Sequence, residues 1–224
     1  LAVRNTGGVP ASATAVALNV TAVGPSTATF LTVHPSDVGR PLASNLNARA
    51  AETVANLVFA RIGADGNVAL YNEAGATHVV VDVVGYWDDD RSTEAGRFIP
   101  FGTPFRWVDS RDGPGPIRPG GTVWVQMAGF PTEDPQIPLP LDGASAVVYN
   151  LTATNTTAGG FLTAFPDTQP TPPLASNLNF AAGQTVAALA VTGDGDGGRI
   201  NMFNPAGSTD VIVDLTGYFT SAWF

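Results

Sequence analysis

The sequence predicts an all-β protein made of two tandem β-sandwich modules, the first without the N-terminal leader strand of the second. One reason is a duplication, because the string PLASNLN at residues 41–47 occurs again, unchanged, at residues 173–179, which lie 132 positions later. A second reason is that 25 glycines and 18 prolines divide the chain into short segments, as turns between short strands require. A third is that no segment sustains an apolar period of 3.6 residues between helix caps.

In the first copy, residues 13–23 place Val16, Leu18 and Val20 on one face and small or polar residues on the other, which predicts a half-buried strand. Gly24 and Pro25 end this strand. Further strands are expected at residues 29–33, 53–62, 68–72 and 78–86, with turns at 63–67 and 74–75. About seven short strands per copy, separated by turn residues, favour a sandwich over other all-β architectures.

The second copy repeats this order of segments. Residues 147–153 match 16–22, residues 161–163 match 30–32, residues 198–204 match 66–72, and residues 211–219 match 79–87. A feature present in both copies is expected to be a requirement of the fold. We therefore expect a first module at residues 1–90, a polar linker at 91–96 and a second module at 97–224.

The two copies differ at their start. The second has a leader at residues 97–122, which contains FRWVDSRDG at 105–113, and residues 123–126 then match residues 1–4. We expect the first module to be incomplete at its N-terminal side and to expose an open sheet edge. Either the chain is cut within a longer array of repeats, or a neighbouring chain supplies the strand, as in donor-strand complementation.

Four ordered motifs resemble a tandem module of secreted actinobacterial proteins, with the pattern R-x-x-D-[TS]-R, L-N-V-T, A-S-N-L-N, G-Q-T-V and V-D-V-x-G-Y-F. They are RWVDSR at 106–111, YNLT at 149–152, ASNLN at 175–179 and DLTGYF at 214–219. The resemblance covers nearly the whole chain and implies an extracellular or cell-surface setting, often beside hydrolase domains. It implies no catalytic residues. The first copy departs from the pattern because it has no Asp-Ser-Arg leader and ends in Tyr86 and Trp87.

Composition restricts the class of partner. The net charge is −9, with ten arginines and no lysine, so the basic patch that nucleic acids or anionic membranes require is not expected. The longest apolar runs, such as residues 79–84, are too short to span a bilayer. With no cysteine, neither disulfides nor thiolate metal sites are available, and no cofactor is expected.

Two acidic residues, Asp82 and Asp214, interrupt Val-rich strands at the same position in both copies, where a lone carboxylate is costly to bury. Each could be a catalytic acid or metal ligand, or a structural acceptor for backbone donors or an arginine, with Arg111 as a partner for Asp214. Repetition in both copies favours the structural role. Asp109 and Arg111 belong to the leader motif and are expected to be structural as well.

Other polar motifs also have two interpretations. The amides of Asn45 and Asn177 can pair with backbone where strands bend, or bind sugar. Asp194 and Asp196, in the string GDGDGG at 193–198, suggest a calcium loop, but the downstream bidentate glutamate is absent and turn chemistry suffices. Both histidines lie in the first copy and no G-x-S-x-G segment occurs, which leaves a paired-carboxylate glycosidase as the enzyme alternative.

The four tryptophans, Trp87, Trp107, Trp124 and Trp223, lie near the ends of the modules. Exposed rings would stack on polysaccharide, whereas buried ones would pack an interface. We expect a non-catalytic extracellular structural or adhesive repeat protein that assembles by strand or edge complementation, with other copies of itself or adjoining domains as partners. The alternative is a carbohydrate-binding module accessory to a secreted hydrolase.

Overall fold

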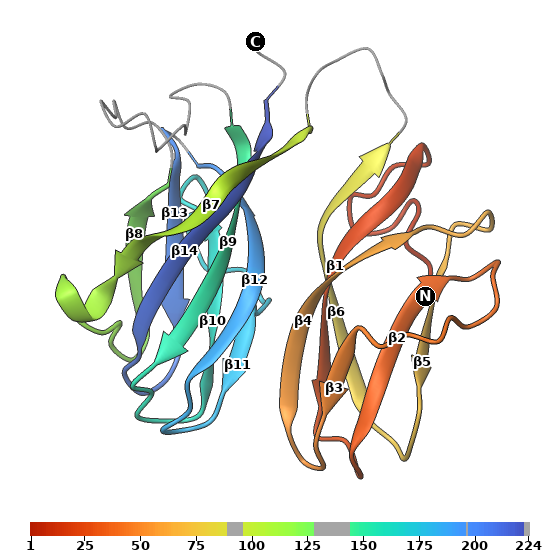
Figure 1. Ribbon diagram of the computed structural model, residues 1–224, viewed down its shortest axis with the longest axis horizontal. Helices are drawn as coiled ribbons and strands as arrows, with labels where there is room; N and C mark the ends of the chain where they lie inside the picture. The colour runs from red at the N-terminus through yellow and green to blue at the C-terminus, as the bar shows by residue number, and fades with distance from the viewer. Residues whose placement is uncertain (89–95, 128–143, 196, 222–224) are drawn as a thin grey trace. The chain divides into compact units, whose positions relative to one another are not determined.

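A computed structural model describes residues 1–88, 96–127, 144–195 and 197–221, without the side chains of residues 101–105. The chain divides into two compact units, Leu1–Asp90 and Arg91–Phe224 (Figure 1). The predicted all-β class is confirmed. Within the described ranges, every strand pair is antiparallel, and one 3₁₀ turn, η1 (Ser110–Asp112), is the only helical element.

The first unit is a sandwich of two three-stranded sheets. One sheet has the order β4 (Thr53–Arg61), β1 (Ala13–Val23), β6 (His78–Asp88), and the other β3 (Leu46–Ala48), β2 (Thr29–Pro35), β5 (Val68–Asn72). Their inner faces enclose a core in which Val16, Leu18 and Val20 are fully buried. The alternating pattern of residues 13–23 therefore gives the central strand, as expected from its apolar face.

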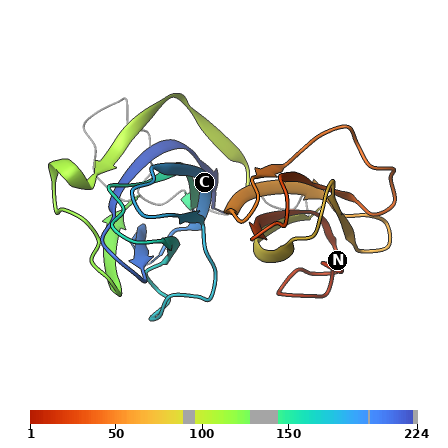
Figure 2. The same cartoon turned by 90° about the horizontal axis from the view of Figure 1, so that it is seen from below.

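The second unit is a sandwich of two four-stranded sheets. One has the order β12 (Val186–Gly193), β9 (Ala144–Thr154), β14 (Asp210–Thr220), β7 (Phe98–Asp109). The other has the order β11 (Leu178–Phe180), β10 (Gly160–Pro166), β13 (Arg199–Asn204), β8 (Gly121–Gln126). Strands β9 to β14 thus repeat β1 to β6, and β7 wraps around the outside of the unit (Figure 2).

Strand β8 has a shorter counterpart in the first unit, formed by the first residues of the chain. The amide of Val3 donates to the carbonyl of Gly66, just as that of Met127 donates to Gly198, and Ala2 forms a bridge with Asn67. Residues 1–3 therefore correspond to 125–127, and the match of residues 1–4 to 123–126 was wrong by two positions. Alternate residues of a strand share a face, so a shift by two preserves the polarity pattern.

The prediction that β1 is only half-buried was also wrong. Its outer-face residues Ala17, Asn19 and Thr21 are each only 4% exposed. On this face Phe59 lies opposite Ala17 and Trp87 opposite Ala15, and the two rings meet edge to face with centroids 5.1 Å apart. Large side chains of the flanking strands thus lie beside the alanines of the central strand, and a single-strand pattern cannot reveal this.

Candidate functional site

Strand β7 closes the edge of β14 in the second module. Asp214 of β14 lies opposite Arg106 of β7, and its two carboxylate oxygens accept from Nε and Nη2 of that arginine at 2.8 and 3.3 Å. The partner of Asp214 is therefore Arg106 rather than Arg111, which was the expected one. The acid within the Val-rich strand serves here as an arginine acceptor between two strands.

Arg111 instead pairs with Asp109, whose side chain is 7% exposed. The carboxylate accepts from Nε and Nη2 of Arg111 at 2.8 and 2.5 Å, from the Arg111 amide, and from Nη1 of Arg106 at 3.3 Å. The Arg111 hydrogen bonds, aided by the backbone bond and both cations, lower the pKa of Asp109 to about 2. Asp109 caps η1, so this cluster fixes the turn after β7.

A buried hydrogen-bonded pair anchors the same turn to β14. The Ser110 hydroxyl donates to Asp210 Oδ1 at 2.7 Å and accepts from the amide of Val211 at 2.9 Å. Asn155 donates to the second oxygen of Asp210 at 2.9 Å. The Asp-Ser-Arg motif of the leader is therefore a latch that holds β7 on the edge of the second module.

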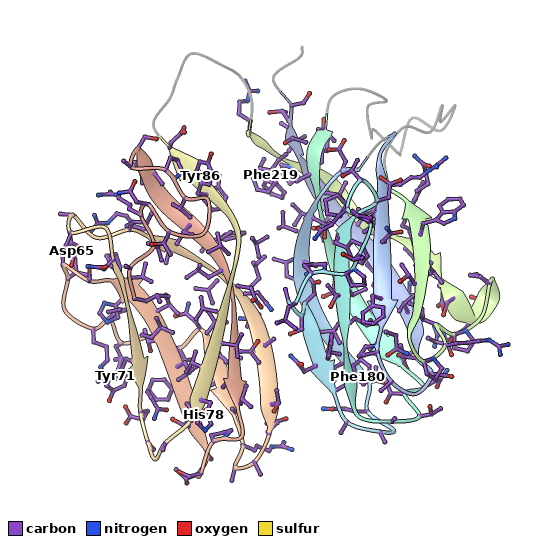
Figure 3. The ribbon with its side chains drawn as sticks, turned by 180° about the vertical axis from the view of Figure 1, so that it is seen from behind. Asp65, Tyr71, His78, Tyr86, Phe180 and Phe219 are labelled. Atoms are coloured by element: carbon purple, nitrogen blue, oxygen red, sulfur yellow. The ribbon has the colours of Figure 1, made fainter. Side chains whose placement is uncertain are left out.

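The corresponding edge in the first module, that of β6, is paired only on its β1 side within the described residues. Side chains of β6 are exposed where those of β14 are buried. Val79 is 39% exposed against 2% for Val211, and Val83 is 41% exposed while Leu215 is fully buried. Tyr86, near the end of β6 away from His78 (Figure 3), is 46% exposed against 8% for Tyr218.

The exposed residues Val79, Val83 and Tyr86 correspond to Val211, Leu215 and Tyr218, which all belong to the core cluster of the second module. We call the exposed set Val79, Val80, Val83 and Tyr86, with the outer backbone of β6, the β6 edge. Of these, Val80 lies on the opposite face of the strand, and its counterpart Ile212 is outside the core cluster. Asp82 lies on this strand opposite Asn19, as Asp214 lies opposite Asn150. The sequence predicted an open edge from the unequal copies, and the structure locates it at β6.

The repeated PLASNLN string is a backbone clamp. Oδ1 of Asn45 accepts from the amide of Val33 at 2.7 Å, and Oδ1 of Asn177 accepts from that of Ala164 at 2.6 Å. The hydroxyls of Thr32 and Thr163 each donate to the carbonyl of the alanine in the string at 2.5 Å. The structure therefore places both asparagines where strands bend, with their Oδ1 atoms engaged by backbone.

One residue of the string points into solvent in both modules. Leu42 is 99% exposed and Leu174 is fully exposed, whereas Leu46 and Leu178 are 4% and 1% exposed. Sequence reasoning missed these two leucines because an apolar residue in a repeated string suggests a core position. The available signal was that each leucine directly follows a proline in a segment between strands.

The tryptophans have separate environments. The ring of Trp107 packs against the core of the second module, and its Nε1 donates to the carbonyl of Gln126 in β8 at 2.6 Å. Trp87 packs on Phe59. Trp124 is 63% exposed, with the guanidinium of Arg199 5.1 Å from its ring centroid. Trp223 lies outside the described residues.

The structure describes only part of the suggested calcium loop, because Asp196 lies outside the described residues. Asp194 follows β12, and burial raises the pKa of its carboxyl group. In the described ranges, no group of three or more His, Asp or Glu side chains is placed to hold a metal ion. Within the same ranges, no helix has the length and apolar character needed to cross a membrane.

Comparison of the chain with protein-family models, with curated proteins and with solved structures found no match.

Proposed function

We propose that this chain is a non-catalytic structural or adhesive repeat protein of the cell surface, which joins to other polypeptides through the β6 edge. The observation that supports this most directly is the contrast between two equivalent strands. β14 is paired with β7, whereas Val79, Val83 and Tyr86 of β6 are exposed at positions that form the core in the second module. An apolar edge strand that is paired with a neighbouring strand on one side only, among the described residues, is a template for pairing with another strand.

The acidic residues support a structural role rather than a catalytic one. Asp109, Asp210 and Asp214 each accept hydrogen bonds from side chains of β7, η1 or the β9–β10 loop. Such fully engaged carboxylates tie strands together and are not free to transfer protons to a substrate. The resemblance of the ordered motifs supports the proposed cell-surface setting, and the acidic composition without lysine is compatible with it.

Light scattering over a concentration series tests this function. We expect the 224-residue chain to associate as its concentration rises, because exposed β6 edges can pair with one another. Val83→Lys should keep the chain monomeric, since a charge at this 41%-exposed position cannot be covered by a second strand without desolvation. A mass that stays at one chain throughout, or association that Val83→Lys leaves unchanged, would contradict the proposal.

A second function, carbohydrate binding, is favoured by Trp124. This exposed ring lies opposite Asn201 on the outer face of β8 and β13, with Gln126 opposite Arg199 on the same face. A flat aromatic face beside amide and guanidinium donors is suited to stacking on a sugar ring and bonding its hydroxyls.

Retention on insoluble polysaccharide distinguishes this second function. Trp124→Ala should abolish retention, while Tyr86→Ala, which removes an exposed ring from the first module, should leave it unchanged. Equal retention of both variants, or none by the unmodified chain, would contradict carbohydrate binding at this face.

A further inference from the structure

We propose that the β6 edge accepts a strand with the chemistry of β7, donated by a second polypeptide. The donated strand would carry the order of residues 106–111, namely arginine, aromatic, apolar, aspartate, serine, arginine. This inference rests on the proposed function and names the partner that the β6 edge would take. It is supported by a glycine, by the shape of the edge, by charge and by the number of available strands.

The glycine is Gly85, which occupies the same position in β6 as Gly217 does in β14. A Cβ atom on Gly217 would lie 2.5 Å from the carbonyl oxygen of Ile99 and 2.7 Å from the ring of Phe98, so β7 can cross β14 only over a glycine. A Cβ atom on Gly85 would have no atom within 4 Å. Nor is Gly85 among the glycines with positive φ.

Nothing in the described part of the first module therefore requires a glycine at position 85. Glycine in a strand interior weakens the strand, and it commonly marks the close approach of another backbone. A strand crossing β6 as β7 crosses β14 would require it. The proposed partner strand therefore explains why position 85 is a glycine.

The two edges also share an irregular shape. The pairing of β6 with β1 shifts register between Val83 and Gly85, and that of β14 with β9 shifts between Leu215 and Gly217, at the equivalent positions. The pairing of β7 with β14 also shifts register between Leu215 and Gly217, where β7 passes from Phe105 to Pro100, and it shifts once more between Val213 and Asp214. Because β6 and β14 share the irregularity before the glycine, a strand with the local geometry of β7 would meet the same edge shape on β6 as on β14.

Charge specifies the register of the donated strand. Asp82 stands on β6 where Asp214 stands on β14, and Asp214 takes two hydrogen bonds from Arg106. An arginine at the corresponding place in the donor would form a charge-assisted pair with Asp82. Its neighbouring apolar and aromatic side chains would then cover Val79 and Val83.

The number of strands indicates that the donor is not the β7 of another copy. β7 is paired with its own β14 over seven positions, so exchange of β7 between copies would open one edge for each edge that it filled. A second polypeptide with its own β7-type segment fills the β6 edge without opening another.

Binding of a synthetic peptide to the 224-residue chain tests the inference. The peptide has the sequence of residues 97–113, and binding is followed by calorimetry and by amide hydrogen exchange. We expect one peptide per chain, slower exchange of amides in β6, and suppression of the self-association that we expect light scattering to detect. The same peptide with glutamine in place of its Arg106 should bind at least about tenfold more weakly, since it loses the charge-assisted pair.

The matched variants are Gly85→Val and Gly39→Val. Both side chains would enter open space, so neither variant should change the melting temperature, but only Gly85→Val should abolish peptide binding. Unchanged binding by Gly85→Val, or slower exchange in β14 in place of β6, would overturn the inference. Self-association through the β6 edge that the peptide does not reverse would overturn it in favour of edge-to-edge pairing of copies, while the proposed function would stand.

Discussion

At the scale of single residues, the identical string in both modules separates residues that the fold uses from residues that it does not. Its asparagines accept backbone hydrogen bonds and its second leucine is buried, but Leu42 and Leu174 are almost entirely in solvent. An exposed leucine adds little to stability. Its presence in both copies identifies a surface position whose role lies outside the folding of its own module.

Asn177→Ala and Leu174→Ser should therefore have opposite outcomes although they lie three residues apart. Asn177→Ala leaves the amide of Ala164 without its acceptor and should lower the free energy of unfolding by about 1–3 kcal/mol. Leu174→Ser should change it by less than about 0.5 kcal/mol. Urea denaturation measures both values, and equal destabilisation would show that the exposed leucine has a structural role.

Acid should weaken the second module through Asp109. Its pKa is about 2 in the folded chain against an ordinary value of 3.8, so the carboxylate stabilises the fold above pH 4 and this contribution is lost as the pH falls from about 4 to about 2. In Asp109→Asn the free energy of unfolding should fall less steeply over this interval. Thermal unfolding at a series of pH values gives the two slopes, and identical slopes would exclude Asp109 as their source.

At the scale of elements, equivalent strands solve the same packing problem with different side chains. β9 buries Tyr149 completely, and its hydroxyl pairs with that of Thr192 in β12 at 2.8 Å, while burial raises the pKa of Tyr149. The first module has Leu18 and Ala60 at these places, both buried. A polar pair and an apolar pair are thus alternative fillings of the same core site.

Thr192→Val should lower the free energy of unfolding by about 1–3 kcal/mol, because the Tyr149 hydroxyl is left without a partner in the core. Tyr149→Phe combined with Thr192→Val should recover most of this loss, since both polar groups are then removed. Chemical denaturation of the two single variants and the double variant completes the cycle. Strictly additive losses would show that the two hydroxyls do not depend on one another.

At the scale of the whole molecule, the chain contains two separate hydrophobic cores, one in each unit. The first also has the β6 edge, whose apolar side chains remain in contact with water. A module that buries less of its apolar surface gains less from folding. The two modules should therefore differ in stability even though their strands correspond.

Calorimetry should resolve two unfolding transitions, with the first module melting at the lower temperature. Leu18→Ala should shift the lower transition and Leu151→Ala the upper one, each by a loss of about 2–5 kcal/mol, because both leucines are fully buried in their own cores. A single transition that both variants shift equally would show that the modules unfold together.

The sequence alone determined the fold class and the positions of most strands. Residues 13–23 and 68–72 were expected as strands and are β1 and β5 to the residue, because period-two polarity and the turns that bound it are local properties. The duplication also identified which segments of the two modules correspond, because the order of the motifs is a property of the sequence itself.

Only the tertiary structure decided which residues meet. It paired Asp214 with Arg106 in place of Arg111, moved the match of residues 1–4 by two positions, and brought Phe59 and Trp87 together beside the alanines of β1. Each of these depends on the register between strands far apart in sequence. An alternating polarity pattern is unchanged by a shift of two residues, so it cannot determine that register. The difference between the open space at Gly85 and the crowded position of Gly217 also required the structure. Whether a Cβ atom would fit at a glycine depends on neighbouring atoms that the sequence does not place.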